Sequence, residues 1–178
     1  FMKAEPRGES VVIAGFGNVG SNLAEILAEN GFRVMAVSDS EGALFAPSGL
    51  DIKRIIEDRE KYGRLVQNIC YFKPLAGIAS EAKCEVISNE GLLKLPADIL
   101  APAAIEGTIN AKNAPEIRAK IILEMANGGV ASDAYDILEK RGILVIPDIL
   151  ANGGGVAGSY VEWSSNLARK SLPEEAEL

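Results

Sequence analysis

The sequence contains no histidine. Within this chain, that excludes a serine or cysteine nucleophile activated by histidine, and any acid–base step that uses histidine. The two cysteines, Cys70 and Cys84, lack C-x-x-C spacing, so we expect no structural zinc and no other metal site. We also expect no disulfide, because the remaining composition is that of a cytoplasmic protein.

Runs of basic residues and long apolar runs are missing as well. The 18 Lys and Arg are outnumbered by 25 Asp and Glu, for a net charge of −7. Nucleic acids and anionic membranes are therefore not expected partners. No apolar run approaches the roughly 20 residues that span a bilayer, and no signal-peptide pattern opens the sequence. We expect a cytoplasmic protein.

One stretch dominates what is present: VVIAGFGNVG at residues 11–20. Gly15, Gly17 and Gly20 form G-x-G-x-x-G between an apolar strand, 10–14, and an amphipathic run. The first glycine allows a tight turn, the second lets backbone approach a pyrophosphate, and the third lets helix and strand pack closely. The pattern predicts a dinucleotide site at a helix N-terminus. The alternative is a glycine-rich turn without a ligand.

Asp39 follows the next predicted strand, 32–37, and lies 19 residues after Gly20. A carboxylate about 20 residues beyond the glycines can bind the adenosine ribose hydroxyls. It would repel a 2′-phosphate, and the residues that follow, 40–42, include no cation. NAD is therefore favoured over NADP. Alternatively, Asp39 only caps the loop after the strand.

Strand and helix patterns alternate along the chain. Strands are predicted at 10–14, 32–37, 98–102, 120–124 and 143–146, with a further candidate near 86. A helix that begins with a capping box at Ser48 is predicted over 52–63. Further helices are predicted over 89–94, 109–119, 133–141 and 156–170, and the last of these follows a glycine-rich turn at 151–155. The alternation predicts an α/β fold: a doubly wound, Rossmann-type, mostly parallel sheet with helices on both faces.

This order also suggests a division of the chain. Residues 1–9 are predicted to be a linker and 10–155 a dinucleotide-binding domain. Residues 156–170 would form a C-terminal helix, and 171–178 an acidic tail. Trp163 on that helix is expected to pack against the protein.

Two predicted strand ends carry asparagine beside glycine, at Asn127 and Asn152. An Asn side chain can both donate to and accept from a carboxamide, which suits a nicotinamide amide. The alternative is an asparagine that caps a turn. Ser159 is expected to face the same cleft, unless it is simply a surface hydroxyl.

Several stretches together resemble the glutamate, leucine, phenylalanine and valine dehydrogenases. They are VVIAGFGNVGS at 11–21, AVSDS at 36–40, PAAIE at 102–106, and PDILAN at 147–152 with the following glycines. SYVEW at 159–163 resembles the glutamate dehydrogenase branch. The resemblance runs from about residue 10 to 170.

The resemblance implies oxidative deamination of L-glutamate to 2-oxoglutarate and ammonia, with hydride passed to NAD or NADP. The residues it assigns to the coenzyme are Gly15, Phe16, Gly17, Asn18, Val19, Gly20, Asp39, Ser40, Ala103, Ala104, Asn127 and Asn152. Val156 and Ser159 would bind the substrate side chain, Ser159 through the γ-carboxylate. The complete enzyme would be a homo-oligomer.

The sequence departs from the family in ways that bear on catalysis. In the family, the catalytic lysine and aspartate belong to an upstream domain that these 178 residues do not include, so no catalytic residue is assigned here and this chain alone is expected to be inactive. Gly153 stands where alanine is usual, and residues 65–82 exceed the family loop. Two other functions stay open: the coenzyme domain of a dehydrogenase for apolar amino acids, and a nucleotide-sensing module without chemistry.

Overall fold

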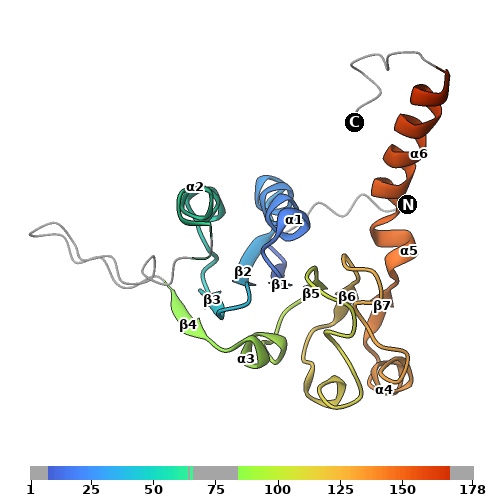
Figure 1. Ribbon diagram of the computed structural model, residues 1–178. Coiled ribbons are helices and arrows are strands. Elements are labelled where there is room, and N and C mark those ends of the chain that lie inside the picture. The colour runs from blue at the N-terminus through green and yellow to red at the C-terminus, as the bar shows by residue number, and fades with distance from the viewer. Residues whose placement is uncertain (1–7, 64, 66–83, 169–178) are drawn as a thin grey trace, which may run out of the picture.

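A seven-stranded sheet forms the centre of the computed structural model, which describes residues 8–63, 65 and 84–168 (Figure 1). The strands are β1 (Ser10–Ala14), β2 (Arg33–Ser38), β3 (Ala43–Phe45), β4 (Glu85–Ile87), β5 (Ile99–Pro102), β6 (Ile121–Leu123) and β7 (Leu144–Ile146). Their order across the sheet is β4-β3-β2-β1-β5-β6-β7. Strands β2, β1, β5, β6 and β7 are parallel, while β3 is antiparallel to both neighbours. The predicted mostly parallel sheet is confirmed.

Helices cover both faces of this sheet. They are α1 (Asn18–Glu29), α2 (Ile52–Tyr62), α3 (Asn89–Leu93), α4 (Tyr135–Lys140), α5 (Asp148–Ala151) and α6 (Gly153–Ala168), with a 3₁₀ turn, η2 (Ala114–Glu116). Figure 1 shows α1 and α2 on one face, and α3 and α4 on the other. The doubly wound arrangement is therefore confirmed.

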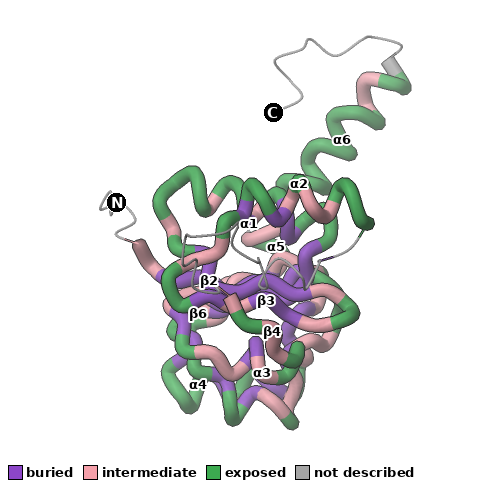
Figure 2. Tube along the Cα trace, turned by 90° about the vertical axis from the view of Figure 1, so that its left-hand side faces the viewer, coloured by how far each residue is buried: buried purple, intermediate pink, exposed green. Residues whose placement is uncertain are grey.

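The central strand β1 contributes to a hydrophobic core on each face. Val11 and Ile13 pack with Ile55 of α2, whereas Val12 packs with Leu92 of α3. All five residues of β1 are buried, and Figure 2 shows the buried sheet between more exposed helices. Burial on both faces explains why the sequence of this strand is continuously apolar rather than alternating.

Helix α2 begins differently from the prediction. Its N-cap is Asp51, whose carboxylate accepts a hydrogen bond from the Arg54 N–H at 3.2 Å. The expected capping box at Ser48 is wrong, because the chain is still in a turn there: Gly49 N–H donates to Ala46 O and has a φ of +98°. The helix ends as predicted at Gly63, in a left-handed conformation.

Two predicted segments are wrong. Strand β3 lies in the region predicted as a loop after Asp39, and it exists because β2 and β4 pair with it on either side. The helix predicted over 109–119 is reduced to η2. There Asn113 accepts from Asn110 N–H and donates to Thr108 O, and such side-chain bonds to backbone favour turns over helix.

The predicted glycine turn at 151–155 is also wrong. Gly153 to Gly155 are the first residues of α6, and none of them has a positive φ. Helix α6 then leaves the body of the domain, as Figures 1 and 2 show. Trp163 is 58% exposed and contacts the ring of Tyr160 at 5.8 Å between centroids, so the expectation that it packs against the protein is not met within the described residues.

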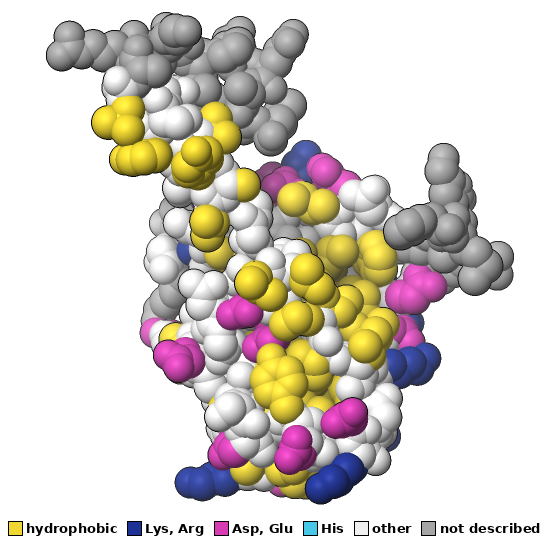
Figure 3. Space-filling view, turned by 90° about the vertical axis from the view of Figure 1, so that its right-hand side faces the viewer, with side chains coloured by type: hydrophobic (Ala, Val, Ile, Leu, Met, Phe, Trp, Pro, Cys, Tyr) yellow, Lys and Arg dark blue, Asp and Glu magenta, His cyan; other side chains and the backbone are white. Residues whose placement is uncertain are grey.

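Apolar side chains gather along α6 and over the flank of the body below it (Figure 3). The exposed large hydrophobic residues from β7 onward are Leu144, Ile149, Leu150, Val156, Tyr160, Val161, Trp163 and Leu167. An apolar surface of this extent on one side of a domain is typical of an interaction site.

Cys84 is disulfide-bonded, which contradicts the expectation of free thiols. The other cysteine of the sequence, Cys70, lies outside the described residues, as do residues 1–7 of the expected linker and the expected tail at 171–178. None of the described helices combines the length and the apolar character that crossing a bilayer requires.

Candidate functional site

The turn after β1 touches the turn after β5. Gly15 has a φ of +115°, and a Cβ built on it would lie 2.6 Å from the Ala104 Cβ. The Ala103 N–H donates to Ala14 O at 2.8 Å. The chain connections diverge on the two sides of β1 here, which is where open α/β sheets bind their ligands.

Close packing of α1 on this turn depends on Gly20. A Cβ on Gly20 would lie 1.9 Å from the Gly15 carbonyl oxygen, so any side chain here would force α1 and the turn apart. Gly17 differs, because a Cβ there would meet nothing within 4 Å. Its lack of a side chain is therefore not required by the fold and leaves space for a ligand.

The N-terminus of α1 faces this space, and no side chain of the described residues caps it. Gly17 is the N-cap and makes no side-chain hydrogen bond, and the first turn contains no acidic residue. The free N–H groups and the helix dipole favour an anion at this position. Ser38 at the end of β2 holds the turn, its hydroxyl accepting from Gly15 N–H at 3.2 Å. The sequence motifs did not identify Ser38 as a site residue, although it lies inside the AVSDS stretch at 36–40.

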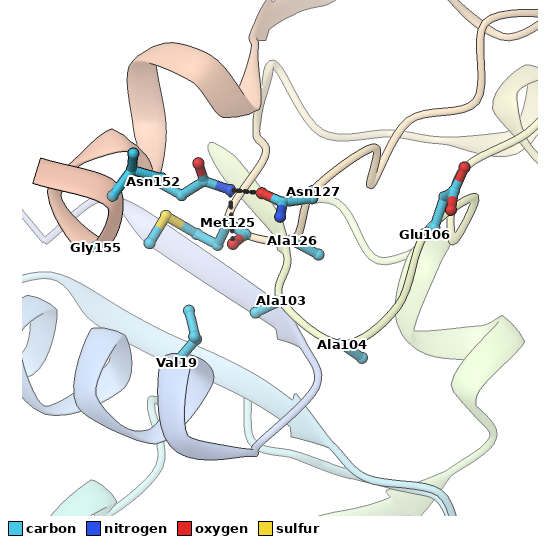
Figure 4. A pocket seen from close by; sticks show the side chains of 10 residues that line it. Val19, Ala103, Ala104, Glu106, Met125, Ala126, Asn127, Asn152 and Gly155 are labelled. Atoms are coloured by element: carbon cyan, nitrogen blue, oxygen red, sulfur yellow. Dashed lines mark hydrogen bonds between the residues drawn. The ribbon is translucent and has the colours of Figure 1, made fainter. Parts of the chain in front are cut away.

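A cavity of about 480 Å³ opens beside this turn, between the ends of β5, β6 and β7 (Figure 4). Its lining residues are Val19, Ala103, Ala104, Glu106, Met125, Ala126, Asn127, Asn152, Gly155 and Val156. Six of the residues singled out from the sequence thus come together from four separate stretches. Glu106, Met125, Ala126 and Gly155 were missed, although each adjoins a predicted strand-end loop.

The two asparagines of the sequence prediction meet in this cavity. Asn152 Nδ2 donates to Asn127 Oδ1 at 2.7 Å and to Met125 O at 3.4 Å (Figure 4). Among the described residues, Asn127 Nδ2 has no partner. The pair therefore presents an amide N–H donor to the cavity while its own acceptor is held in place.

Asp39 lies at the end of β2 and does not line the cavity. Its two carboxylate oxygens accept from backbone N–H groups, Oδ1 from Glu41 at 2.8 Å and Oδ2 from Leu65 at 2.9 Å. In this structure the Asp39 carboxylate therefore caps the loop that follows the strand, which is the alternative given above. Each carboxylate oxygen retains a lone pair, so a ribose contact stays compatible with these bonds. Ser40 beside it is exposed.

The predicted substrate residues separate. Val156 lines the cavity, whereas Ser159 is exposed on the part of α6 that leaves the body and is not a lining residue. Within the described residues, Ser159 is therefore not brought to the coenzyme side of the cleft, and its role remains a prediction.

Comparison with known proteins agrees with this geometry. A family model described as glutamate/leucine/phenylalanine/valine dehydrogenase matches residues 2–177. The chain is 42% identical over 168 residues to the NADP-specific glutamate dehydrogenase of Saccharolobus shibatae, which is 94% of this chain and 37% of that protein. It is 44% identical over 156 residues to the catabolic NAD-specific glutamate dehydrogenase of Bacillus subtilis, 88% of this chain and 34% of that protein.

Among solved structures, the hetero-hexameric glutamate dehydrogenase of Thermus thermophilus superimposes with a TM-score of 0.77 at 33% identity, covering 96% of this chain and 37% of that one. The chain thus spans little more than a third of the length of its relatives. The family model covers nearly the whole sequence, and the fold is the one that the resemblance implied. The chain belongs to the glutamate, leucine, phenylalanine and valine dehydrogenase family.

Proposed function

We propose that residues 10–155 form the coenzyme-binding domain of a glutamate dehydrogenase. The observation that carries the proposal is the cavity beside the uncapped N-terminus of α1, lined by small residues and by the Asn127–Asn152 pair. Its volume is within the range of small-molecule sites. The names of the relatives support the assignment, since both the Saccharolobus and the Bacillus proteins are glutamate dehydrogenases.

The described residues include groups that suit each part of a dinucleotide. The open space at Gly17 and the free N–H groups of α1 suit the pyrophosphate. Asp39 would accept from the adenosine ribose. The small side chains of Ala103 and Ala104 leave room for the nicotinamide, and Asn127 Nδ2 would donate to its carboxamide oxygen. When bound, the nicotinamide ring would accept the hydride removed from the amino acid.

We propose NAD as the preferred coenzyme, with NADP as the alternative. Asp39 would repel a 2′-phosphate, and the residues immediately after it, Ser40, Glu41 and Gly42, include no cation. The relatives include one NADP-specific and one NAD-specific enzyme, so membership in this group is compatible with either coenzyme.

We propose that catalysis requires the rest of the protein. Residues 156–170 would lead toward a catalytic domain, and the exposed apolar surface of α6 would pack there. The substrate would be L-glutamate, with Ser159 contacting its γ-carboxylate. We further propose a homo-oligomer, and a cytoplasmic location because NAD(P) and glutamate are intracellular metabolites.

A titration of the purified 178-residue chain tests the coenzyme assignment. Calorimetry should detect binding of NAD, and Gly17→Val should abolish it while the protein remains folded by circular dichroism. With glutamate and NAD, the chain should produce no NADH above this variant. Failure of the folded wild-type chain to bind NAD refutes the coenzyme assignment, and NADH production above the Gly17→Val control refutes the need for a second domain.

Assays of the full-length protein test the substrate. Oxidation of glutamate should be far more efficient than oxidation of leucine. The Ser159 hydroxyl should bind the γ-carboxylate of glutamate, and bound leucine would leave that hydroxyl without a hydrogen-bond partner. Comparable efficiency on both amino acids would favour an enzyme for apolar amino acids. NAD binding by the full-length protein without turnover of either would favour a nucleotide-sensing module.

A further inference from the structure

The loop that presents Asn127 to the cavity is anchored on a buried carboxylate. Glu124 follows β6 directly and is only 1% exposed. Its Oε1 accepts from the Val130 N–H and its Oε2 from the Tyr135 hydroxyl, each at 2.6 Å. A carboxylate this deeply buried is costly unless it is hydrogen-bonded, and here each oxygen has a donor.

Both donors lie at or beyond the C-terminal end of the loop 125–130, whereas Glu124 directly precedes the loop. Val130 is its last residue, while Tyr135 begins α4, so Glu124 ties the far end of the loop back to its start. Tyr135 is partly exposed, but desolvation of its hydroxyl and the hydrogen bond to the Glu124 carboxylate raise the pKa of Tyr135 to about 12. The hydroxyl therefore stays protonated at neutral pH and remains a donor.

Two further bonds hold the middle of the loop. The Gly128 N–H donates to Asp148 Oδ2 at 2.9 Å, and the Gly107 N–H donates to Gly128 O at 2.8 Å. On the other side of Asn127, the Ala126 N–H donates to Pro102 O at 2.9 Å, and Asn127 Oδ1 accepts from Asn152. The direction of Asn127 Nδ2 thus depends on a backbone that is fixed on both sides.

We propose that Glu124 is a positioning residue, which holds the loop 125–130 through Val130 and Tyr135 so that Asn127 donates to the carboxamide of the coenzyme. This inference rests on the proposed function. Glu124 does not line the cavity, and it acts through the loop rather than by touching the coenzyme. Donors preorganised in this way bind better than donors that must be ordered by the ligand.

Comparing NAD with ADP-ribose, which lacks the nicotinamide, separates positioning from general stability. In Glu124→Met, the Val130 N–H and the Tyr135 hydroxyl lose their acceptor. We expect the affinity for NAD to fall about fivefold, the worth of one hydrogen bond, while the affinity for ADP-ribose changes less than twofold. Asn127→Ala should show the same selective loss. Glu139→Met, the same change at an exposed position of α4, is the matched control.

The conservative variant Glu124→Gln should rescue binding. Its amide oxygen can accept from the Val130 N–H, and its NH₂ can donate to the Tyr135 oxygen, so both bonds survive. We expect NAD affinity within twofold of wild type. If Glu124→Met does not fold, Tyr135→Phe replaces it: amide hydrogen exchange in 125–131 should be faster than in wild type, and NAD affinity should fall more than ADP-ribose affinity.

The outcomes are distinguishable. Equal weakening of NAD and ADP-ribose binding in the Glu124 or Tyr135 variants would make Glu124 a structural residue and overturn the inference. Unchanged NAD binding in Glu124→Met or Asn127→Ala would also overturn it, while leaving the coenzyme assignment in place. Failure of the folded wild-type chain to bind NAD would refute the proposed coenzyme-binding function, and the inference with it.

Discussion

Alanine substitutions at Gly17 and Gly20 should separate the coenzyme-binding role of the glycine turn from its structural role. The same methyl group is added three residues apart in one motif. At Gly20 it would lie 1.9 Å from the Gly15 carbonyl oxygen, and at Gly17 it would meet nothing within 4 Å. Gly20→Ala should therefore damage the fold, and Gly17→Ala should damage the binding.

The magnitudes follow from these contacts. A carbon and a carbonyl oxygen normally approach no closer than about 3.3 Å, so α1 must move by more than 1 Å to accept the Gly20→Ala methyl group. Overpacking of this kind costs about 1–3 kcal/mol. For a protein of this size, that lowers the melting temperature by about 2–12 °C. Gly17→Ala changes only the helix N-cap, which costs about 1 kcal/mol at most.

Thermal unfolding and calorimetric titration with NAD measure the two effects on the same samples. Gly17→Ala should stay within about 4 °C of wild type and lose NAD affinity at least about tenfold, because its methyl group occupies the space for the pyrophosphate. An unchanged melting temperature for Gly20→Ala would refute the close approach of α1 to the turn. Wild-type NAD affinity in Gly17→Ala would refute the position of the pyrophosphate.

Two further predictions concern carboxylates at opposite ends of the sheet. Asp39→Ser should narrow the difference between NAD and NADP affinity, because it removes the repulsion between the carboxylate and the 2′-phosphate. It should also lower stability, because the backbone N–H groups of Glu41 and Leu65 lose their acceptor. Calorimetry with both coenzymes measures the first effect and a melting curve the second. Hydrogen bonds from Lys120 and from Ser10 lower the pKa of Asp98, so Asp98→Asn should cost about 1–3 kcal/mol at neutral pH, measured by urea unfolding.

The pH dependence of the Asp98 effect has a definite sign. A carboxyl whose pKa is lower in the folded state stabilises the protein above its unfolded pKa of about 4, and that contribution is lost as the pH falls further. The difference in stability between wild type and Asp98→Asn should therefore shrink below about pH 4. A difference that is constant between pH 7 and pH 3 would contradict this account. For Asp39→Ser, an unchanged ratio of NAD to NADP affinity would contradict the role of its charge.

Local sequence patterns were sufficient to predict those elements whose structure depends on residues close together in the sequence. Residues 11–14 of β1 are buried on both faces and are therefore all apolar, and Gly20 is constrained by the Gly15 carbonyl oxygen only five residues away. The same holds for the end of α2, where Gly63 stops the helix. These features were predicted correctly because the interactions that cause them are short in sequence.

Other features depend on partners that no local pattern contains. The three residues of β3 are too few for a periodicity, and they form a strand only because β2 and β4 lie beside them. Asp39 acquires its second partner from residue 65, and Asn127 meets Asn152 only once β6 and β7 are aligned. The burial of Glu124 is also a result of tertiary packing. From the sequence alone, a glutamate that follows a short strand would be expected on the polar surface.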